Sequence, residues 1–293
     1  MIPQKTHAIW NATTGIEDIA ANWRDFASDE MAVLAAHWQV QRRQLQEAGQ
    51  LEPFMSRLKR EWAIETGSIE GLYTLDRGVT QSLIEHGFRA ELISHGSHDK
   101  PRHIILSLLQ DQQEALEGVF SFVKSNRTLS TSFIKQMHAL LVNSQDTTEG
   151  RDAQGRIAMV ALVKGDWKRQ PNFPVRDGIT YAYCPPEHTA SEMDRLVALF
   201  DGQAGIPPDI QAAWLHHRFT QIHPFQDGNG RVARAIGSLV LVKAGLFPFL
   251  VTPNERNDYL DALEAADAGS LALLVGLARK MQKRQYAQAL EIG

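Results

Sequence analysis

The segment QIHPFQDGNGRVAR, Gln221–Arg234, is the most informative stretch of the chain. It gathers a histidine, an aspartate, two glycines, an asparagine and two arginines within a few turns of chain. Asp-Gly and Asn-Gly pairs are signals of β-hairpin turns, but the apolar residues on either side recur at helical spacing and do not alternate. The sequence therefore predicts a glycine-rich turn that leads into a helix.

Two common glycine-containing loops do not fit this segment. An EF-hand calcium loop that started at Asp227 would need glutamate at its twelfth position, where the chain has Ser238. A phosphate-binding P-loop needs Gly-Lys-Ser/Thr after its glycines, where the chain has Gly-Arg-Val. Both types of loop are excluded.

The backbone and the arginines of the turn are suited to binding an anion. Glycines such as Gly228 and Gly230 let main-chain N–H groups approach an anion closely, and the helix that follows adds the positive end of its dipole. Asn229 supplies amide donors, while Arg231 and Arg234 supply planar guanidinium groups that match phosphate oxygens. Together these residues predict a phosphate cradle.

Two further side chains supply a metal ligand and a base. Asp227 is a hard oxygen ligand for a magnesium ion, which usually binds together with substrate phosphates. His223 is able to accept a proton near neutral pH. An anion cradle, a metal ligand and a base are the parts of a phosphate-transfer site.

Helical periodicity dominates the rest of the chain and predicts an all-α fold. Apolar residues recur three or four positions apart in the segments that we expect to be helical, which are 27–63, 104–124, 129–142, 192–200, 211–222, the stretch from about Gly230 to Gly245, and 271–290. Ser130 or Ser132 is expected to cap the helix over 129–142.

One segment, Asn172–Pro186, departs from this pattern. It contains the hairpin dipeptide Asp177-Gly178, followed by an alternating run of Ile179, Tyr181 and Tyr183. An isolated hairpin is only marginally stable unless it packs on helices or pairs with another segment, and prolines at 171 and 174 point to an open edge. We interpret the segment either as a surface excursion or as an edge offered to a partner peptide.

Composition limits the classes of protein to be considered. The chain has 293 residues and a net charge of −4, so no excess of positive charge indicates nucleic acid as its main partner. No apolar run reaches the length of a membrane span, and no secretory signal is visible. The single cysteine, Cys184, is interpreted as a small apolar residue in a reducing compartment. We therefore expect a cytoplasmic protein that binds neither nucleic acid nor membrane.

The segment HPFQDGNGR matches the motif of the Fic domain family, His-Pro-Phe-x-Asp/Glu-Gly-Asn-Gly/Lys-Arg, at every defined position, and Arg234 continues it. The preceding WLHHRFTQIHPF resembles the helix that enters this motif. The stretch WKRQPNF…YAYCPP resembles the strand pair that the family uses as a flap. The resemblance covers roughly Ile105–Asp267 and one upstream element.

This resemblance implies a Fic-type helical bundle with a small β-hairpin flap and an N-terminal helical layer. Residues 1–100 would form the N-terminal helical region, with an inhibitory motif at 66–71. Residues 101–267 would form the Fic core, with the flap at 172–183 and the active-site loop at 223–234. Residues 268–293 would form a C-terminal helix.

The resemblance also implies an enzyme that transfers AMP from ATP to a Ser, Thr or Tyr hydroxyl of a protein, with release of pyrophosphate. His223 would be the general base, and Asp227 would hold Mg²⁺ between the α- and β-phosphates. The phosphates would be bound by the backbone of Gly228, Asn229 and Gly230, by the Asn229 side chain, by Arg231, and by Arg234 at the γ-phosphate. The partners implied are a protein target and, in a homo-oligomer, further copies of the chain, with auto-modification among the expected products.

Upstream, TGSIEG, Thr66–Gly71, matches the inhibitory motif of the family, Ser/Thr-x-x-x-Glu-Gly/Asn. In members that carry this motif, the glutamate pairs with the second arginine of the catalytic motif, which here implies a pair between Glu70 and Arg234. The pair would occupy the guanidinium that the γ-phosphate needs. Two glycines make the segment a poor isolated helix, so the local sequence by itself favours a turn with a surface acid.

Other functions stay open at the level of sequence. The same loop would also serve transfer of a different nucleotide or phospho group, or removal of AMP with the inhibitory glutamate orienting water. A non-enzymatic regulator is a further alternative, against which the intact catalytic motif argues. The toxin of a two-gene pair is disfavoured because the inhibitory motif lies within the chain. His216 and His217 are interpreted as core or surface histidines, and Tyr259 as a residue near the adenine.

Overall fold

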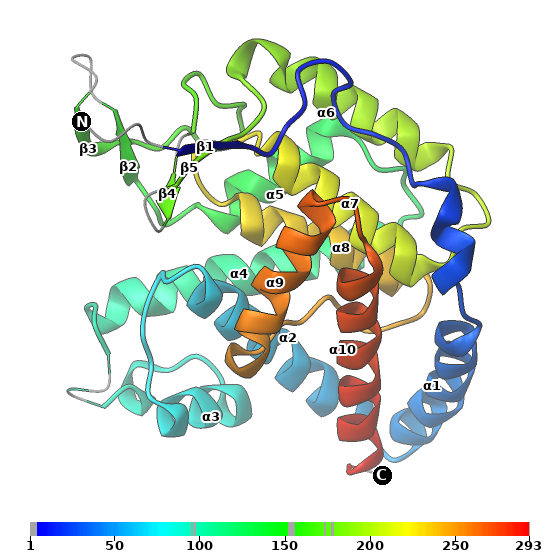
Figure 1. The fold of residues 1–293 in the computed structure, drawn as a ribbon. Helices are drawn as coiled ribbons and strands as arrows, with labels where there is room; N and C mark the ends of the chain where they lie inside the picture. Colours follow the sequence, from blue (N-terminus) through cyan, green and yellow to red (C-terminus); the bar gives the residue numbers. More distant parts are fainter. Residues whose placement is uncertain are drawn as a thin grey trace.

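The computed structural model describes residues 5–94, 96, 98–151, 156–172, 174–176 and 179–292, and its helices confirm the prediction of an all-α fold (Figure 1). The α-helices are α1 (Glu30–Glu47), α2 (Leu51–Ile69), α3 (Arg77–His86), α4 (Arg102–Lys124), α5 (Thr131–Leu141), α6 (Pro186–Asp201), α7 (Pro208–Ile222), α8 (Asn229–Lys243), α9 (Arg256–Asp267) and α10 (Ala272–Leu290). Short 3₁₀ helices are η1 (Ala21–Phe26), η2 (Ala90–Leu92) and η3 (Pro253–Glu255).

Helix ends follow local sequence signals. The hydroxyl of Ser130 accepts the N–H of Phe133 at 3.2 Å, which confirms Ser130 as the cap of α5. Pro186 and Pro208 stand at the first positions of α6 and α7, where the N–H that proline lacks would have no helical partner. α8 is followed by Gly245, whose φ of 77° ends the helix where it was expected to end.

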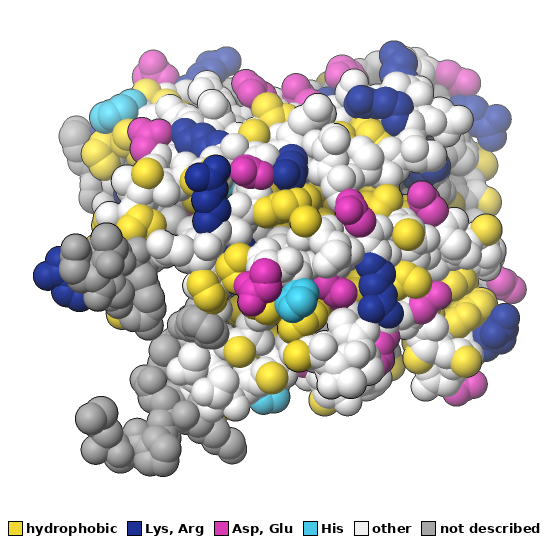
Figure 2. Space-filling model, turned by 90° about the horizontal axis from the view of Figure 1, so that it is seen from above, with side chains coloured by type: hydrophobic (Ala, Val, Ile, Leu, Met, Phe, Trp, Pro, Cys, Tyr) yellow, Lys and Arg dark blue, Asp and Glu magenta, His cyan; other side chains and the backbone are white. Residues whose placement is uncertain are grey.

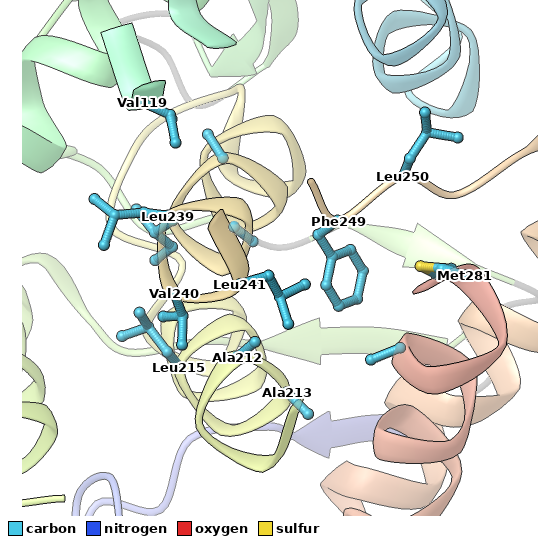
Figure 3. Close-up of a cluster of buried hydrophobic side chains, with 14 of the residues drawn as sticks. Val119, Ala212, Ala213, Leu215, Leu239, Val240, Leu241, Phe249, Leu250 and Met281 are labelled. Atoms are coloured by element: carbon cyan, nitrogen blue, oxygen red, sulfur yellow. The ribbon is translucent and has the colours of Figure 1, made fainter. Parts of the chain in front are cut away.

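α8 lies at the centre of the molecule, packed on α7, α4 and α5. Its side chains are buried on nearly every face, as expected of a central helix. Figure 3 shows the apolar contacts around it, which involve Val119, Ala212, Ala213, Leu215, Leu239, Val240, Leu241, Phe249, Leu250 and Met281. Burying a side chain such as valine or leucine contributes about 1.5–3 kcal/mol, so the loop that precedes α8 is attached to a well-packed helix pair.

The N-terminal helices pack continuously onto this core. The Trp38 ring of α1 lies 4.6 Å from the Phe247 ring, and the indole N–H of Trp62 in α2 donates to the Phe249 carbonyl at 3.0 Å. A second apolar cluster joins α2 and α3 to α4 and consists of Ile64, Tyr73, Val79, Leu83, Ile84, Ile93, Ile105, Leu108 and Leu109. The domain division at residue 100 therefore crosses continuous packing, and it stays a prediction.

The strands form two small sheets. β2 (Thr147–Arg151) and β3 (Ile157–Ala161) are antiparallel. In the other sheet β5 (Ile179–Ala182) pairs with β4 (Val175–Arg176) in antiparallel and with β1 (Lys5–Ala8) in parallel. Among the described residues β4, which follows Pro174, lies at an edge of this sheet, as the prolines predict, whereas β5 is paired on both sides. The expected turn at Asp177-Gly178 lies outside the described residues.

The described part of the molecule has no helix that combines the length and the apolar character needed to cross a bilayer. Figure 2 shows acidic and basic side chains interspersed over one face, with no block of a single sign. That distribution agrees with the small net charge of −4.

Candidate active site

His223 turns the chain sharply out of α7. Its φ and ψ of 52° and 59° lie in the left-handed region, which few residues other than glycine adopt. Its N–H donates to the Phe219 carbonyl at 2.9 Å. The half-buried imidazole stacks on the ring of Tyr183, next to β5, with centroids 4.0 Å apart and planes inclined by 20°. The turn and the stack together fix the direction in which the imidazole points.

The imidazole of His223 lines a cleft of about 380 Å³. Glu70 and Gly230 form a polar part of its wall, and α9 contributes an apolar part with Tyr259, Leu260 and Leu263. A cavity that combines apolar walls with convergent polar groups is suited to a small-molecule ligand. The structure thus brings the expected base, the glycine turn and Glu70 of the upstream motif to one cavity.

Asn229 and Phe225 give the loop between α7 and α8 its shape. Asn229 Oδ1 accepts the N–H of Phe225 at 2.9 Å, and Asn229 Nδ2 donates to the Phe225 carbonyl at 2.8 Å. The Phe225 ring is fully buried and lies parallel to the His138 ring at a centroid distance of 3.7 Å. The Asn229 amide is thus engaged within the loop, and its predicted contact with phosphate stays a prediction.

His138, on α5, supports the loop from the protein interior. Its Nδ1 accepts the N–H of Gly165 at 2.9 Å, so its proton is on Nε2, which donates to the Asp227 carbonyl at 3.1 Å. Burial lowers the pKa of His138 to about 4, although the bond to Asp227 opposes that shift. The ring is therefore neutral at physiological pH and acts as a fixed hydrogen-bond bridge.

Residues before β4 clamp the outer side of the same loop. The ammonium of Lys168 donates to the Ile222 carbonyl at 3.3 Å. Asn172 Nδ2 donates to the carbonyls of Phe225 and Gln226, both at 3.1 Å. Burial lowers the pKa of Lys168 to about 8. The loop is thus held from the flap side as well as from α5.

The carboxylate of Asp227 is held in place by several donors. Oδ1 accepts the N–H of Gly228 at 2.6 Å, and Oδ2 accepts from Thr148 at 3.2 Å and from the amide of Gln145. Burial alone would raise the pKa of Asp227, but the charge of Arg231 and these hydrogen bonds outweigh burial and hold the pKa below its ordinary value. Asp227 is therefore ionised at neutral pH.

A magnesium ion would have to share Asp227 with other oxygen donors. Within the described ranges, no three His, Cys, Asp or Glu side chains lie close enough together to form a metal site of their own. Magnesium in phosphate-transfer sites needs only one or two carboxylates besides phosphates and water. An ionised, one-third exposed carboxylate beside the glycine turn fits that role.

Both glycines of the turn meet a steric requirement. Gly228 has a φ of 77°, and a Cβ there would lie 3.0 Å from Val142. A Cβ on Gly230 would collide with the carboxylate of Glu70. Since the Glu70 carboxylate lies directly against the first turn of α8, it covers part of the predicted phosphate cradle.

Arg231 points into the protein. Its side chain is fully buried, and its guanidinium donates to the Leu141 carbonyl at 2.9 Å and to the side-chain oxygen of Gln145 at 2.9 Å. Burial lowers the pKa of Arg231, and the charge of Asp227 opposes that shift. These contacts tie α8 to the end of α5, so the phosphate role predicted for Arg231 stays a prediction.

Arg234 and Glu70 form the ion pair that the sequence predicts. Arg234 Nη2 lies 2.7 Å from Glu70 Oε1, and the arginine is 1% exposed. Burial would lower the pKa of Arg234, but the charge of Glu70 and further hydrogen bonds raise the pKa above its ordinary value. The expectation of poor helix formation is corrected for Thr66–Ile69, which belong to α2, whereas Glu70 lies in the turn that follows the helix, as the local sequence predicts. Packing against α4 and α8 outweighs the low helix propensity of Gly67.

The hydroxyl of Tyr259 extends this network into the core. It lies 3.4 Å from Arg234 Nη1 and 3.0 Å from His216 Nε2. Burial lowers the pKa of His216 well below its ordinary value. His217 is buried too and lies 2.8 Å from a carboxylate oxygen of Asp267, so the interpretation of both as core histidines is confirmed.

Residues 128–241 match the family model described as the Fic/DOC family. The chain carries a Fic/DOC-family domain. It is 25% identical to protein adenylyltransferase fic-1 of Caenorhabditis elegans over 223 residues, which are 74% of this chain and 39% of that protein. It is 51% identical to a Fido domain-containing protein of Dictyostelium discoideum over 61 residues, 20% of this chain and 42% of that protein. The chain thus spans less than half the length of these curated relatives.

Solved structures of Fic proteins share the fold of most of the chain. A Fic domain-containing signaling protein from Bacteroides thetaiotaomicron aligns with a TM-score of 0.69 at 22% identity, covering 88% of this chain and 96% of that one. Fic-1 of C. elegans aligns with a TM-score of 0.66 at 21% identity, covering 89% and 72% respectively. The predicted helical fold with a small flap is confirmed.

Sequence reasoning missed several residues that build the candidate site. His138, Gln145 and Thr148 contact Asp227 from α5 and from the segment that follows it. None of them carries a local signal, because each lies more than 75 residues away along the chain and acts through the fold. Helical periodicity alone places His138 on a buried helix face without indicating its partner.

Proposed function

We propose that this chain is a protein adenylyltransferase that transfers AMP from ATP to a Ser, Thr or Tyr hydroxyl of a protein, and that Glu70 holds it in an inhibited state. The observation that carries the proposal is the convergence of His223, Gly230 and Glu70 on one cleft. Relatives named protein adenylyltransferase, from C. elegans and Nematostella vectensis, support it.

The reaction needs a base beside the acceptor hydroxyl. His223 takes the hydroxyl proton as the oxygen forms its bond to the α-phosphorus, because an un-ionised hydroxyl is a weak nucleophile. The bond from the α-phosphorus to its bridging oxygen breaks, and pyrophosphate leaves with the electron pair. Backbone N–H groups at the start of α8, from Asn229 and Gly230, would stabilise the phosphate charge.

Asp227 would hold the magnesium ion that neutralises the phosphate charge when nucleotide is bound. The hydrogen bonds to Gly228, Gln145 and Thr148 keep its carboxylate ionised and aimed beside the turn. His138 adds rigidity by fixing the backbone of Asp227 itself. These contacts support the proposed role of Asp227, because they hold an ionised carboxylate in a fixed orientation beside the turn.

The contacts of Arg234 support the proposed inhibition. Its donors are directed to Thr66, Glu70 and Tyr259, so the guanidinium is occupied. The carboxylate of Glu70 also lies against Gly230. A γ-phosphate would have to displace this carboxylate, and two negative groups would compete for one buried arginine. In the inhibited state, ATP would therefore bind weakly or in an unproductive pose.

Removal of AMP from a modified protein is the second candidate. Glu70 lines the same cleft as His223, which supports a role for its carboxylate in orienting a water molecule toward a bound AMP–protein bond. In that reaction, water would attack the phosphorus and the protein hydroxyl would leave with a proton from His223. Glu70 would then promote hydrolysis while it suppresses transfer.

The deciding experiment is intact-mass and peptide-mapping spectrometry of the Glu70→Gly protein incubated with ATP and magnesium. We expect addition of AMP to the protein itself at least about ten times faster than in the unmodified sequence, since the inhibitory carboxylate is gone. The double variant Glu70→Gly, His223→Ala should lose about 10²–10⁴-fold of that rate. Glu70→Gln, which keeps the shape of the side chain but not its charge, is the matched control and should be intermediate.

Three results would reject parts of the proposal. Unchanged AMP labelling in the double variant Glu70→Gly, His223→Ala would reject His223 as the general base. No gain in the Glu70→Gly protein would reject inhibition by Glu70. Preferred incorporation of another nucleotide in a competition among labelled nucleoside triphosphates would replace AMP by that group.

A further inference from the structure

The N-terminal strand of the chain occupies an edge of the flap. β1 pairs in parallel with β5, from Lys5 opposite Ile179 to Ala8 opposite Ala182. The N–H of Ile9 continues the pairing with a bond to the Ala182 carbonyl at 2.9 Å. Because β4 pairs with the other edge of β5, β5 has no side left for another strand. Figure 1 shows β1 lying beside β5.

β1 leads directly to the cleft of His223. Ile9 is buried and lines that cleft together with Tyr181, Tyr183 and His223. The Ile9 carbonyl also accepts a hydrogen bond from the Gln221 side chain at 3.3 Å. The residue that follows the paired strand is therefore held beside the proposed base.

We propose that β1 is an intramolecular pseudosubstrate. It occupies the position on β5 where a strand of the protein target would pair, and it places Ile9 where the side chain to be modified would lie. Isoleucine has no hydroxyl, so the pseudosubstrate occupies the acceptor site without being modified. The target would be an extended segment that replaces β1, runs parallel to β5 and carries its Ser, Thr or Tyr at the Ile9 position. The modification rests on the proposed function, whereas the strand exchange does not.

β1 is held loosely enough to be exchanged. The side chains of Thr6, His7 and Ala8 are exposed, so the strand buries little apolar surface apart from Ile9. Segments with few buried contacts open at a small fraction of the free energy of global unfolding. Its main side-chain anchor is Trp10, whose indole N–H donates to Glu192 at 3.1 Å.

The residues that follow β1 are held by hydrogen bonds and burial, which limits how far the N-terminal segment can detach from the core. A turn over Asn11–Gly15 is closed by a bond from the Gly15 N–H to the Asn11 carbonyl at 2.8 Å. Ile16 is 1% exposed, and its N–H donates to Glu192 at 2.6 Å. Release of β1 would therefore stop at this turn and leave the helical core intact.

Strand exchange is tested first without any nucleotide. A shortened chain that begins at Asn11 is mixed with a fluorescent peptide of the sequence Lys5–Trp10, and binding is followed by fluorescence anisotropy. We expect saturable binding to the shortened chain and at least about ten-fold weaker binding to the full chain, whose own strand competes. The same peptide with proline at the Ile9 position, which cannot donate to Ala182, is the control and should bind more weakly. Equal binding to both chains, or to neither, would overturn the exchange.

Hydrogen exchange on the full chain keeps the test decisive if the shortened chain does not fold. The amides of residues 6–9 should exchange at least about 100-fold faster than those of α8. Equal protection in β1 and α8 would show that the strand opens only with global unfolding, and would overturn the proposal.

The position of the acceptor is tested by Ile9→Thr in the Glu70→Gly background. We expect a new AMP group at position 9, mapped by peptide mass spectrometry, and none at position 8 in the matched Ala8→Thr variant, where the side chain is exposed. Labelling elsewhere on the chain without labelling at position 9 would overturn the assigned register. If Glu70→Gly shows no AMP transfer at all, the proposed function fails, and the peptide and exchange results still decide whether β1 is exchangeable.

Discussion

Thr66 fixes the orientation of Arg234 with two hydrogen bonds. Arg234 Nε donates to the Thr66 hydroxyl at 2.7 Å, and Nη2 donates to the Thr66 carbonyl at 2.9 Å. Nη2 also faces Glu70 at 2.7 Å. Thr66 and Glu70, the first and fifth residues of the motif TGSIEG, therefore bind the same guanidinium. This gives a physical reason for a hydroxyl at the start of that motif.

Thr66→Val should remove one of the hydrogen bonds to Arg234 and lower the stability of the protein. The substitution leaves the buried Nε–H of Arg234 without its acceptor, which costs about 1–3 kcal/mol, or several degrees in melting temperature for a chain of this size. Thr66→Ser keeps the hydroxyl and should stay within about 1 kcal/mol. Thermal denaturation of both variants measures the difference. Equal melting temperatures would show that this hydrogen bond does not contribute.

Asn229→Asp should destabilise the active-site loop. The carboxylate still accepts the N–H of Phe225 but no longer donates to the Phe225 carbonyl, and it places charge against that oxygen. This loss costs about 1–3 kcal/mol, whereas a negative charge at the start of α8 regains only about 0.3–1 kcal/mol. Chemical denaturation should therefore show a net loss. Asn22→Asp, on an exposed face of η1, is the control and should change stability by less than about 0.5 kcal/mol.

The lowered pKa of His138 predicts that the protein loses stability in acid. Burial lowers its pKa to about 4 from an ordinary 6.5, so between these values the unfolded chain binds a proton that the native ring excludes. The stabilising contribution is therefore complete above pH 6.5 and is lost as the pH falls through about 4. A shift of this size corresponds to a loss on the order of 3 kcal/mol.

Denaturant titrations across that pH range measure the effect of His138. His138→Gln removes the titrating ring and keeps a side chain able to donate to the Asp227 carbonyl. Its stability should fall less steeply below pH 6.5 than that of the unmodified chain. Parallel pH profiles for the two proteins would contradict the assignment of the acid sensitivity to His138.

The sequence predicts the elements whose signals are local. Helical spacing identifies α4, α5, α7, α8 and α10, and the catalytic motif places His223 and the glycine turn in one loop. The pair between Glu70 and Arg234 is predicted only through the resemblance to the Fic family, because residues so far apart share no local pattern. Contacts of this kind depend on the packing of α2 against α8.

Contacts that depend on the fold were not predicted. Arg231 has the same side chain as Arg234 and lies one helical turn earlier, but it faces α5 and is used in holding the loop. Residues three positions apart lie near the same face of a helix, so the motif does not reveal that Arg231 reaches α5 while Arg234 reaches Thr66 on α2. β1 was also missed, since its short polar sequence forms a strand only because β5 offers an edge.

Glu65 lies on α2, five residues before Glu70, and is buried without a full set of partners. It is 8% exposed, and its Oε2 has no hydrogen-bond partner among the described residues. Burial raises the pKa of Glu65 to about 7, with the charge of Glu61 adding to the shift and that of Arg284 opposing it. The native protein therefore favours the protonated form of this side chain.

Glu65→Gln should make the protein more stable at high pH. Because the native pKa is raised from 4.5 to about 7, the contribution of Glu65 is complete below pH 4.5 and is lost as the pH rises through about 7. A neutral amide avoids that loss, so the variant should exceed the unmodified chain by up to about 3 kcal/mol above pH 7 and match it near pH 4.5. Glu52 is exposed in the first turn of α2, so Glu52→Gln is the control and should show no such gain in stability at high pH. If Glu65→Gln is less stable than the unmodified chain above pH 7, the carboxylate has stabilising contacts that outweigh the cost of burying its charge.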